Sequence, residues 1–309
     1  MPSIEYLSSA DWVWQAFTIA AALFQVARNT SQRTLSDRIS AIGATYVRFL
    51  FGLPVAILWL ALLFPVFGWH MANPGAFLMW CLIGGVVQIL GNGCLLLAMR
   101  ERSFMLAVAY SKTEAIQAAL LAIVLLGEAI RMGVGVALII ATAGVMMITL
   151  GRGTLREVGL AGALKSRGAL WGLLCGALFG YGATLYRAAA LASEATPFIA
   201  AAYTLITVLL IQSVILTIYL VVRAPQTFAG IRSSVRLCLF SGAMGGLASL
   251  CWFTAMALHT IADVRALGLT EMLFSYLASR RLYREGITRA ELAGSVLIGG
   301  AALALIYVN

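Results

Sequence analysis

Residues 104–126 read FMLAVAYSKTEAIQAALLAIVLL, an apolar run with two charged residues, Lys112 and Glu114, near its middle. A helix needs about 20 predominantly apolar residues to cross a bilayer, and this run has that length. Ionisable side chains at such a depth are costly and usually face a cavity or a partner. The run therefore predicts a transmembrane helix with a polar contact or a polar function at its centre.

Nine further apolar runs make up most of the chain. Of the 309 residues, 62% are hydrophobic and 11% are charged, which excludes an ordinary water-soluble domain. Because backbone groups in lipid must be satisfied within the segment, each run is predicted to be a helix. A kink is expected at Pro54, which lies in the middle of its run. The expected fold is an all-α integral membrane protein with ten transmembrane helices at 11–28, 40–66, 74–99, 104–126, 131–150, 168–188, 198–222, 235–258, 263–279 and 288–308.

Basic residues fall on alternate connections between these runs. Sixteen Lys and Arg residues lie in the odd-numbered connections, the first of which holds Arg28, Arg33 and Arg38. The even-numbered connections and the tails hold Arg131 and, at a boundary, Arg187. Because loops rich in Lys and Arg stay in the cytoplasm, both termini are predicted to be outside. This asymmetry explains the net charge of +9, so the expected partner is the lipid bilayer and no nucleic acid.

The chain repeats itself at an offset of 157 residues. This offset pairs Trp14 with Trp171, Tyr46 with Tyr203, Gly85 with Gly242, Cys94 with Cys251, Thr113-Glu114 with Thr270-Glu271, and Glu128 with Glu285. Each half holds five predicted helices, and an odd number makes the second copy enter the membrane from the opposite side. Many secondary transporters are built from such inverted repeats and bind substrate near the midplane. The predicted organisation is an N-terminal repeat over 1–150, a cytoplasmic linker over 151–167 and a C-terminal repeat over 168–309.

Polar residues inside the apolar runs are the candidates for substrate binding. The run at 263–279, the repeat partner of 104–126, carries Asp263, Arg265 and Glu271. These central charges are open to two interpretations, salt bridges between helices or groups that bind substrate or a coupling ion. On a helical period Lys112 and Glu114 point apart, so they are not expected to pair with each other. The predicted cavity walls are Gln15, Phe24, Gln88, Asn92, Tyr110, Lys112, Glu114, Tyr181, Trp252 and Glu271.

Other residue types suggest structural roles. All five cysteines lie inside apolar runs without metal-ligand spacing, and the two histidines lie near predicted helix ends. We therefore expect no cofactor, no metal site and no disulfide. Gly172, Gly176 and Gly180 repeat a GxxxG spacing, which favours close helix packing over a gating hinge.

Two short motifs and the arrangement of helices resemble a known transporter group. Arg48-Phe49 in the second run, Gly127-Glu128 after the fourth and ten helices in two halves resemble the EamA-type exporters of the drug/metabolite transporter superfamily, and within them the YddG-like exporters of aromatic amino acids. This resemblance implies export of aromatic and other amino acids across the bacterial inner membrane without nucleotide hydrolysis. The second half departs from the pattern, with Leu205-Ile206 and Arg284-Glu285 at the matching positions.

The sequence thus favours a secondary transporter, with no enzymatic activity, that moves a small amphiphilic substrate by alternating access, and a monomer is expected. A proton-coupled exporter of cationic drugs is the alternative within transport, with Glu114 or Glu271 as proton carrier. A membrane-embedded enzyme would need a metal or an acid/base cluster near one interface. An ion channel is the remaining class that a duplicated membrane protein allows.

Overall fold

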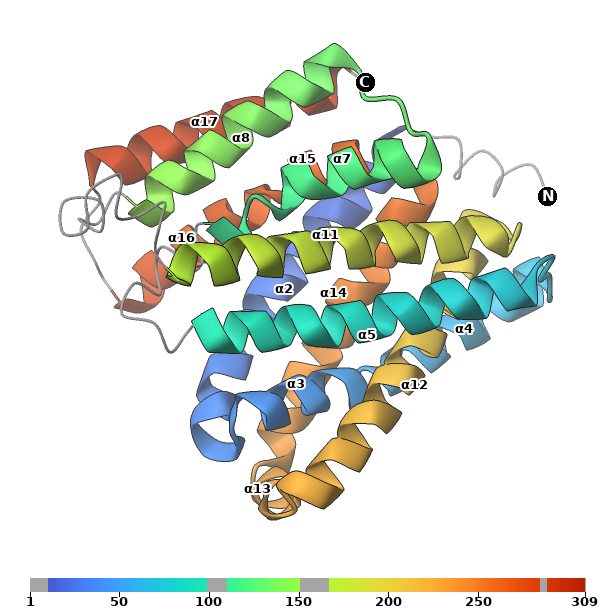
Figure 1. Cartoon of the computed structure of the whole chain (residues 1–309). Coiled ribbons are helices and arrows are strands. Elements are labelled where there is room, and N and C mark those ends of the chain that lie inside the picture. The colour runs from blue at the N-terminus through green and yellow to red at the C-terminus, as the bar shows by residue number, and fades with distance from the viewer. Residues whose placement is uncertain (1–10, 99–109, 151–166, 284–287, 309) are drawn as a thin grey trace. The chain divides into compact units, whose positions relative to one another are not determined.

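The structure is a computed structural model, and it describes residues 11–98, 110–150, 167–283 and 288–308 (Figure 1). These residues form helices, and no strand occurs among them. The first half holds α2 (Asp11–Ile39), α3 (Ala41–Leu50), α4 (Leu53–Phe67), α5 (Pro74–Ala98), α7 (Glu114–Leu126) and α8 (Met132–Leu150). The second half holds α11 (Arg167–Ala192), α12 (Pro197–Arg223), α13 (Gln226–Ser233), α14 (Val235–Leu258), α15 (Ile261–Gly268), α16 (Thr270–Tyr283) and α17 (Arg289–Val308).

Among the described residues, six stretches are long and apolar enough to cross a membrane: Ala41–Phe67, Pro74–Leu95, Arg167–Ala192, Pro197–Arg223, Val235–Leu258 and Arg289–Tyr307. Two shorter helices, Glu114–Leu126 and Met132–Ile148, are also apolar. The all-helical, multi-pass class is therefore confirmed for the described residues. The count of ten membrane helices stays a prediction.

Three predicted runs differ from a single straight helix. The second run is interrupted after Leu50 and resumes at Leu53, so Pro54, where a kink was predicted, lies in the first turn of α4 just after a break in the helix. The fourth and ninth runs, expected as continuous helices, are interrupted as well. A turn at Lys112–Thr113 precedes α7, and Leu269 separates α15 from α16. Residues 104–109 of the fourth run lie outside the described residues.

The first helix is longer than predicted, and this corrects the assignment of one charge. α2 continues to Ile39 instead of ending near residue 28, so Arg28 lies inside a helix and not in a connection. Its side chain is buried, and both Nε and Nη2 donate to Oδ1 of Asn29, at 3.2 and 2.7 Å. Arg33 and Arg38, farther along the same helix, are exposed as loop charges would be. Arg28 is therefore a buried residue of the helix and should not count toward the basic face.

The chain forms two compact units, which are described separately. Unit 1 comprises residues 1–86 and 185–259, and unit 2 comprises 87–184 and 260–309. Each unit takes residues from both sequence halves, and α5 and α11 each contribute to both. In unit 1, α2 packs along α14, and α12 packs against α3, α4 and α14. A Cβ on Gly246 of α14 would lie 3.0 Å from the carbonyl oxygen of Gly52, so only glycine lets α14 pass so close to the interrupted second run.

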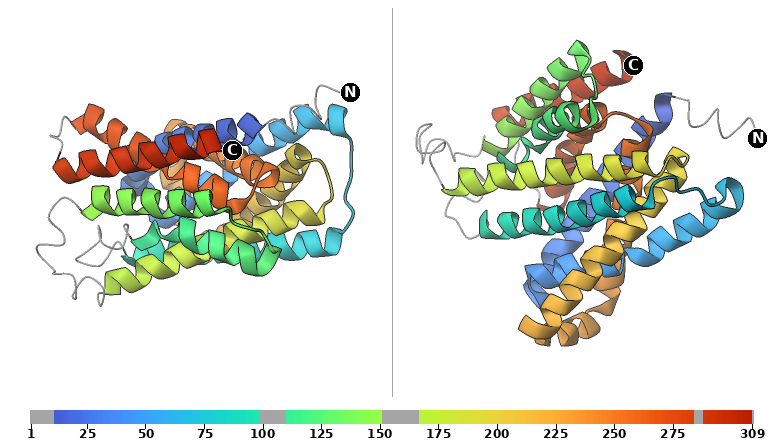
Figure 2. Two further views of the ribbon diagram at one scale, coloured as in Figure 1. Left: turned by 90° about the horizontal axis from the view of Figure 1, so that it is seen from above. Right: turned by 45° about the vertical axis from the view of Figure 1, so that its right-hand side comes forward.

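Unit 2 contains the other interrupted runs. Its tightest pair is α8 and α17, which lie side by side in Figures 1 and 2. Helix α7 packs on α15, which in turn contacts α8 and α17. Ala118 and Ala122 of α7 and Ile261 of α15 form a buried apolar cluster, with Leu126 packed against it. These contacts bring the interruption of the fourth run next to that of the ninth.

Candidate functional site

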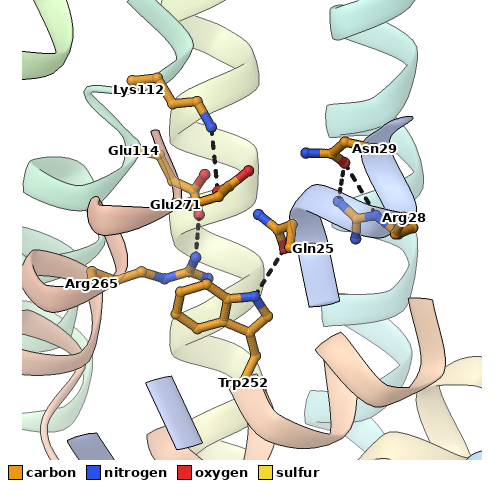
Figure 3. A network of polar contacts seen from close by, with 8 residues as sticks. All are labelled: Gln25, Arg28, Asn29, Lys112, Glu114, Trp252, Arg265 and Glu271. Carbon is orange, nitrogen blue, oxygen red and sulfur yellow. Dashed lines mark hydrogen bonds and ion pairs between the residues drawn. The ribbon is translucent and has the colours of Figure 1, made fainter. Parts of the chain in front are cut away.

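The candidate site in unit 2 is a cluster of four charges at the two helix interruptions, which we call the charge cluster: Lys112, Glu114, Arg265 and Glu271 (Figure 3). Lys112 Nζ lies 3.7 Å from Oε2 of Glu271, and Arg265 Nη1 lies 2.9 Å from Oε1 of Glu114. As predicted, Lys112 and Glu114 do not pair with each other. The structure thus shows ion pairs between distant segments, which is the first of the two interpretations, and the binding of a substrate or ion by these groups stays a prediction.

The two interruptions have the same local chemistry. Thr113 Oγ1 donates to the carbonyl oxygen of Tyr110 at 2.6 Å, and Thr270 Oγ1 donates to that of Leu267 at 2.8 Å. A threonine hydroxyl that bonds to the carbonyl three residues back competes with the helical pattern. Each threonine is followed directly by a glutamate, so both carboxylates lie in the first turn of a new helix. At such a position the helix dipole interacts favourably with negative charge.

The glycine spacing of α11 accommodates the first interruption. A Cβ on Gly176 would lie 3.0 Å from the carbonyl oxygen of Ser111, and one on Gly180 would lie 3.0 Å from the amide nitrogen of Ala118. The prediction of close packing is therefore confirmed for these two glycines. Because they have no side chain, the backbone of the turn packs directly against α11.

A second set of charged residues lies where α7 ends and α15 begins. Gly127 ends α7 in the left-handed region, with φ at 67°. Oε2 of Glu128 then accepts a hydrogen bond of 3.0 Å from the backbone N–H of Ile261, the first residue of α15. Asp263 is buried, accepts from the Thr260 hydroxyl and lies 3.5 Å from Nη2 of Arg131. The Gly127-Glu128 motif thus has a structural role as the cap of two helices.

The remaining predicted residues of unit 2 are half-buried. Gln88 and Asn92 lie one turn apart on α5, and the Asn92 amide donates to the Gln88 carbonyl oxygen at 2.8 Å within the helix. Tyr110 lies two residues before Lys112, and Tyr181 lies on α11. The structure therefore places seven of the ten predicted residues in unit 2: Gln88, Asn92, Tyr110, Lys112, Glu114, Tyr181 and Glu271.

Unit 1 holds the other three, Gln15, Phe24 and Trp252. Gln15 is buried and Phe24 is half-buried on α2. Trp252 is buried on α14, and its Nε1–H donates to Oε1 of Gln25 at 2.9 Å (Figure 3). The sequence reasoning missed Gln25 as the indole's partner, although an amide beside Phe24 within an apolar run was a usable signal.

Two further polar residues of unit 1 were also missed. The Tyr186 hydroxyl donates to the carbonyl oxygen of Gly84 at 2.9 Å. The buried Gln212 amide donates to the carbonyl oxygen of Gly85 at 3.3 Å and to the Tyr186 hydroxyl oxygen at 3.4 Å. These bonds join α5, α11 and α12 through backbone carbonyls, which is a structural arrangement. In unit 2, Arg265 was recognised as a central charge but not as a wall residue, although it forms the shorter ion pair.

Metal chemistry has no cluster to support it in the described part of the chain. No group of three or more His, Cys, Asp or Glu residues there could hold an ion. All five cysteines are buried and free. His259, at the end of α14, stacks on the indole of Trp14 with ring centroids 4.5 Å apart.

Comparison with known proteins gives a family match in the first part of the chain. Residues 12–150 match the EamA-like transporter family. The match covers the N-terminal half and includes Lys112, Glu114 and the Gly127-Glu128 motif. A crystal structure described only as "Crystal structure of protein" superposes with a TM-score of 0.72, covers 96% of both chains and is 15% identical in sequence. At that identity the likeness concerns the fold. No curated protein matches the chain.

Proposed function

We propose that this chain is a secondary transporter of the drug/metabolite transporter superfamily that exports amino acids, with aromatic and other apolar ones favoured. One observation carries the proposal. Two cations and two anions without net charge lie at helix interruptions in a chain of apolar helices, and residues 12–150 match a transporter family. Intramembrane ionisable residues mark substrate and ion pathways more often than they serve stability alone.

An amino acid carries one carboxylate and one ammonium group, which complement a cation and an anion of the cluster. In this proposal the substrate carboxylate meets Lys112 and its ammonium meets Glu271. Their 3.7 Å separation is the longer of the two ion pairs, so it is the easier one for a zwitterion to separate. Arg265 and Glu114, at 2.9 Å, hold the adjoining helices together while the other pair exchanges partners.

The other predicted wall residues give the site its preference for apolar side chains. Tyr110 and Tyr181 supply aromatic surface, and Gln88 and Asn92 supply amides that bond to the substrate backbone groups. For Gln15, Phe24 and Trp252, which lie in unit 1, substrate contact stays a prediction from the sequence. The YddG-like subtype is part of this proposal and rests on the sequence resemblance.

Alternating access between two inverted repeats, 1–150 and 168–309, is the proposed mechanism. The helix starts support it: Asp11 and Arg167, Ala41 and Pro197, and Glu114 and Thr270 each lie 156 residues apart, and Met132 and Arg289 lie 157 apart. In an inverted-repeat transporter the two halves can exchange conformations. The exchange exposes the site first to one side of the membrane and then to the other. The bacterial inner membrane, periplasmic termini and a monomeric state belong to the same proposal.

Flux in liposomes tests the assignment. The purified protein would be reconstituted, and uptake of labelled phenylalanine and leucine would be measured with and without a proton gradient. Saturable uptake without a gradient is expected, and it should fall at least tenfold in Lys112→Gln and Glu271→Gln. Lys112→Arg should retain most of it, and Arg33→Gln, which removes an exposed charge on α2, serves as the matched control. Unchanged uptake in both cluster variants would refute the site.

A proton-coupled exporter of cationic drugs is the second candidate, favoured by two carboxylates, Glu114 and Glu271, within the membrane helices. It would show gradient-dependent flux of a quaternary ammonium dye and no saturable amino-acid flux. The same liposomes and variants decide between the two, because Glu114→Gln would then abolish dye flux while Lys112→Gln would leave it intact.

A further inference from the structure

Helices α8 and α17 of unit 2 approach most closely at one pair of glycines. A Cβ on Gly144 would lie 2.7 Å from the carbonyl oxygen of Gly294, and one on Gly294 would lie 2.5 Å from that of Gly144. Neither distance is tolerated by a real Cβ, so the backbones meet there without side chains between them. The two helices lie side by side in Figures 1 and 2.

A groove of about 510 Å³ lies on one side of this contact. Its wall from α8, including Met132, Val136 and Ile140, precedes Gly144 in the chain, and its wall from α17, including Val296, Gly300 and Ala304, follows Gly294. Every lining side chain is apolar or absent. The volume is within the range of small-molecule sites, roughly 300–1,000 Å³.

The groove is open to its surroundings along both walls. Val136 is 51% exposed and Val296 is 66% exposed. A Cβ on Gly300 would meet no atom within 4 Å, so the space above that glycine is empty. Both helices are apolar and α17 is long enough to cross a bilayer, so the groove lies where acyl chains are the surrounding solvent.

A cation marks one end of the groove. Arg131 directly precedes Met132, the first residue of α8, and its side chain is 54% exposed. One of its five N–H donors faces Asp263 at 3.5 Å, which leaves the others available on the exposed side. Tyr307, two residues beyond the last lining residue of α17, is 85% exposed, as expected of an aromatic side chain at a membrane interface. This end of the groove therefore presents the chemistry that a lipid phosphate contacts.

We propose that this groove binds one anionic phospholipid, with an acyl chain between α8 and α17 and the phosphate on Arg131. The start of α8 adds unpaired backbone N–H groups and a partial positive charge beside the arginine, which favours the same anion. A second copy of the chain fits less well. A two-fold interface brings the same patch of both copies together, so groove would face groove and Arg131 would approach its own charge. The proposal is independent of which substrate is transported.

Native mass spectrometry of the delipidated protein, titrated with phosphatidylglycerol or phosphatidylcholine of equal chain length, tests the proposal. We expect one phosphatidylglycerol per chain, held more tightly than phosphatidylcholine. Gly300→Leu fills the groove and should abolish the tight binding, whereas Gly299→Leu, the next residue in the same helix, also enters open space but does not line the groove and should bind as the wild type does. Arg131→Gln should weaken phosphatidylglycerol binding about fivefold and bring it to the level of phosphatidylcholine.

Four results would overturn the proposal. Equal binding by the Gly300→Leu and Gly299→Leu variants would show that the groove is not used. Equal affinity for the two lipids, unchanged by Arg131→Gln, would show that Arg131 does not contact the lipid phosphate. A dimer that dissociates in Gly300→Leu and binds no lipid would assign the groove to a second copy. Glycerol phosphate without chains should not bind, and tight binding of it would locate the site at the arginine alone.

Discussion

The fourth and ninth apolar runs share one design and differ in their ion pairs. In each, a threonine bonds to the carbonyl three residues back, the helix is interrupted, and a glutamate lies in the first turn of the next helix. Glu114 pairs with Arg265 at 2.9 Å, whereas Glu271 pairs with Lys112 at 3.7 Å. The partners are thus an arginine, whose planar fork fits a carboxylate, and a lysine, whose compact charge exchanges partners more readily. The same kind of helix interruption is therefore accompanied by a short ion pair in one run and by a longer ion pair in the other.

The largest change should follow from breaking the short ion pair. Arg265→Gln leaves Glu114 without its cation in the membrane, and we expect the free energy of unfolding to fall by about 3 kcal/mol. Steric trapping or unfolding by denaturant in mixed micelles would measure it. The double variant Arg265→Gln/Glu114→Gln should recover about half of the loss, and a cost equal to the sum of the single variants would show that the pair contributes no coupling.

Breaking the pair of Lys112 and Glu271 should lower the free energy of unfolding less than breaking the pair of Arg265 and Glu114, and it should lower the transport rate more. Lys112→Gln is expected to lower the free energy of unfolding by about 1 kcal/mol, because at 3.7 Å the two groups lie beyond hydrogen-bond distance. The same cycle with Glu271→Gln would measure a coupling smaller than that of Arg265 and Glu114. Coupling energies in the reverse order would contradict the contrast between the two pairs.

The exit of the fourth run offers a backbone test. Gly127 has a φ of 67°, and a Cβ there would meet no atom within 4 Å, so Gly127→Ala costs conformational strain alone. We expect a loss of about 1 kcal/mol in the free energy of unfolding. Gly135→Ala, inside α8 and without close contacts, is the matched control and should be neutral or slightly stabilising. A loss of the same size in both variants would argue against the left-handed cap.

The smallest effect should come from the cap that joins the two runs. Glu128→Gln keeps an oxygen that can accept the Ile261 N–H, so we expect a loss of about 0.5 kcal/mol, and about 1 kcal/mol for Glu128→Ala. Amide hydrogen exchange at the start of α15 would rise in the alanine variant and stay near the wild-type rate in the glutamine variant. Equal protection in all three proteins would exclude the capping role.

Much of the chemistry of the site could be predicted from the sequence. The pairing of Thr113-Glu114 with Thr270-Glu271 at the repeat offset predicted that both glutamates have similar surroundings, and helical spacing predicted that Lys112 and Glu114 point apart. The interruptions were not predicted, since a threonine in an apolar run is compatible with a continuous helix until its hydroxyl bond is seen. Arg28 was misplaced because a basic residue at the edge of an apolar run looks the same whether the helix stops or continues.

By itself the sequence determined the class: apolar runs of bilayer length must be helical because lipid offers their backbone no other partner. It also placed Lys112, Glu114, Arg265 and Glu271 within apolar runs, and it indicated close packing at Gly176 and Gly180. Only the tertiary structure decided that Glu114 meets Arg265 and Glu271 meets Lys112, and that Glu128 caps α15, because these contacts join residues more than 130 positions apart. Helical periodicity reports the face of a side chain on its own helix, whereas a partner on another helix is set by how the helices pack.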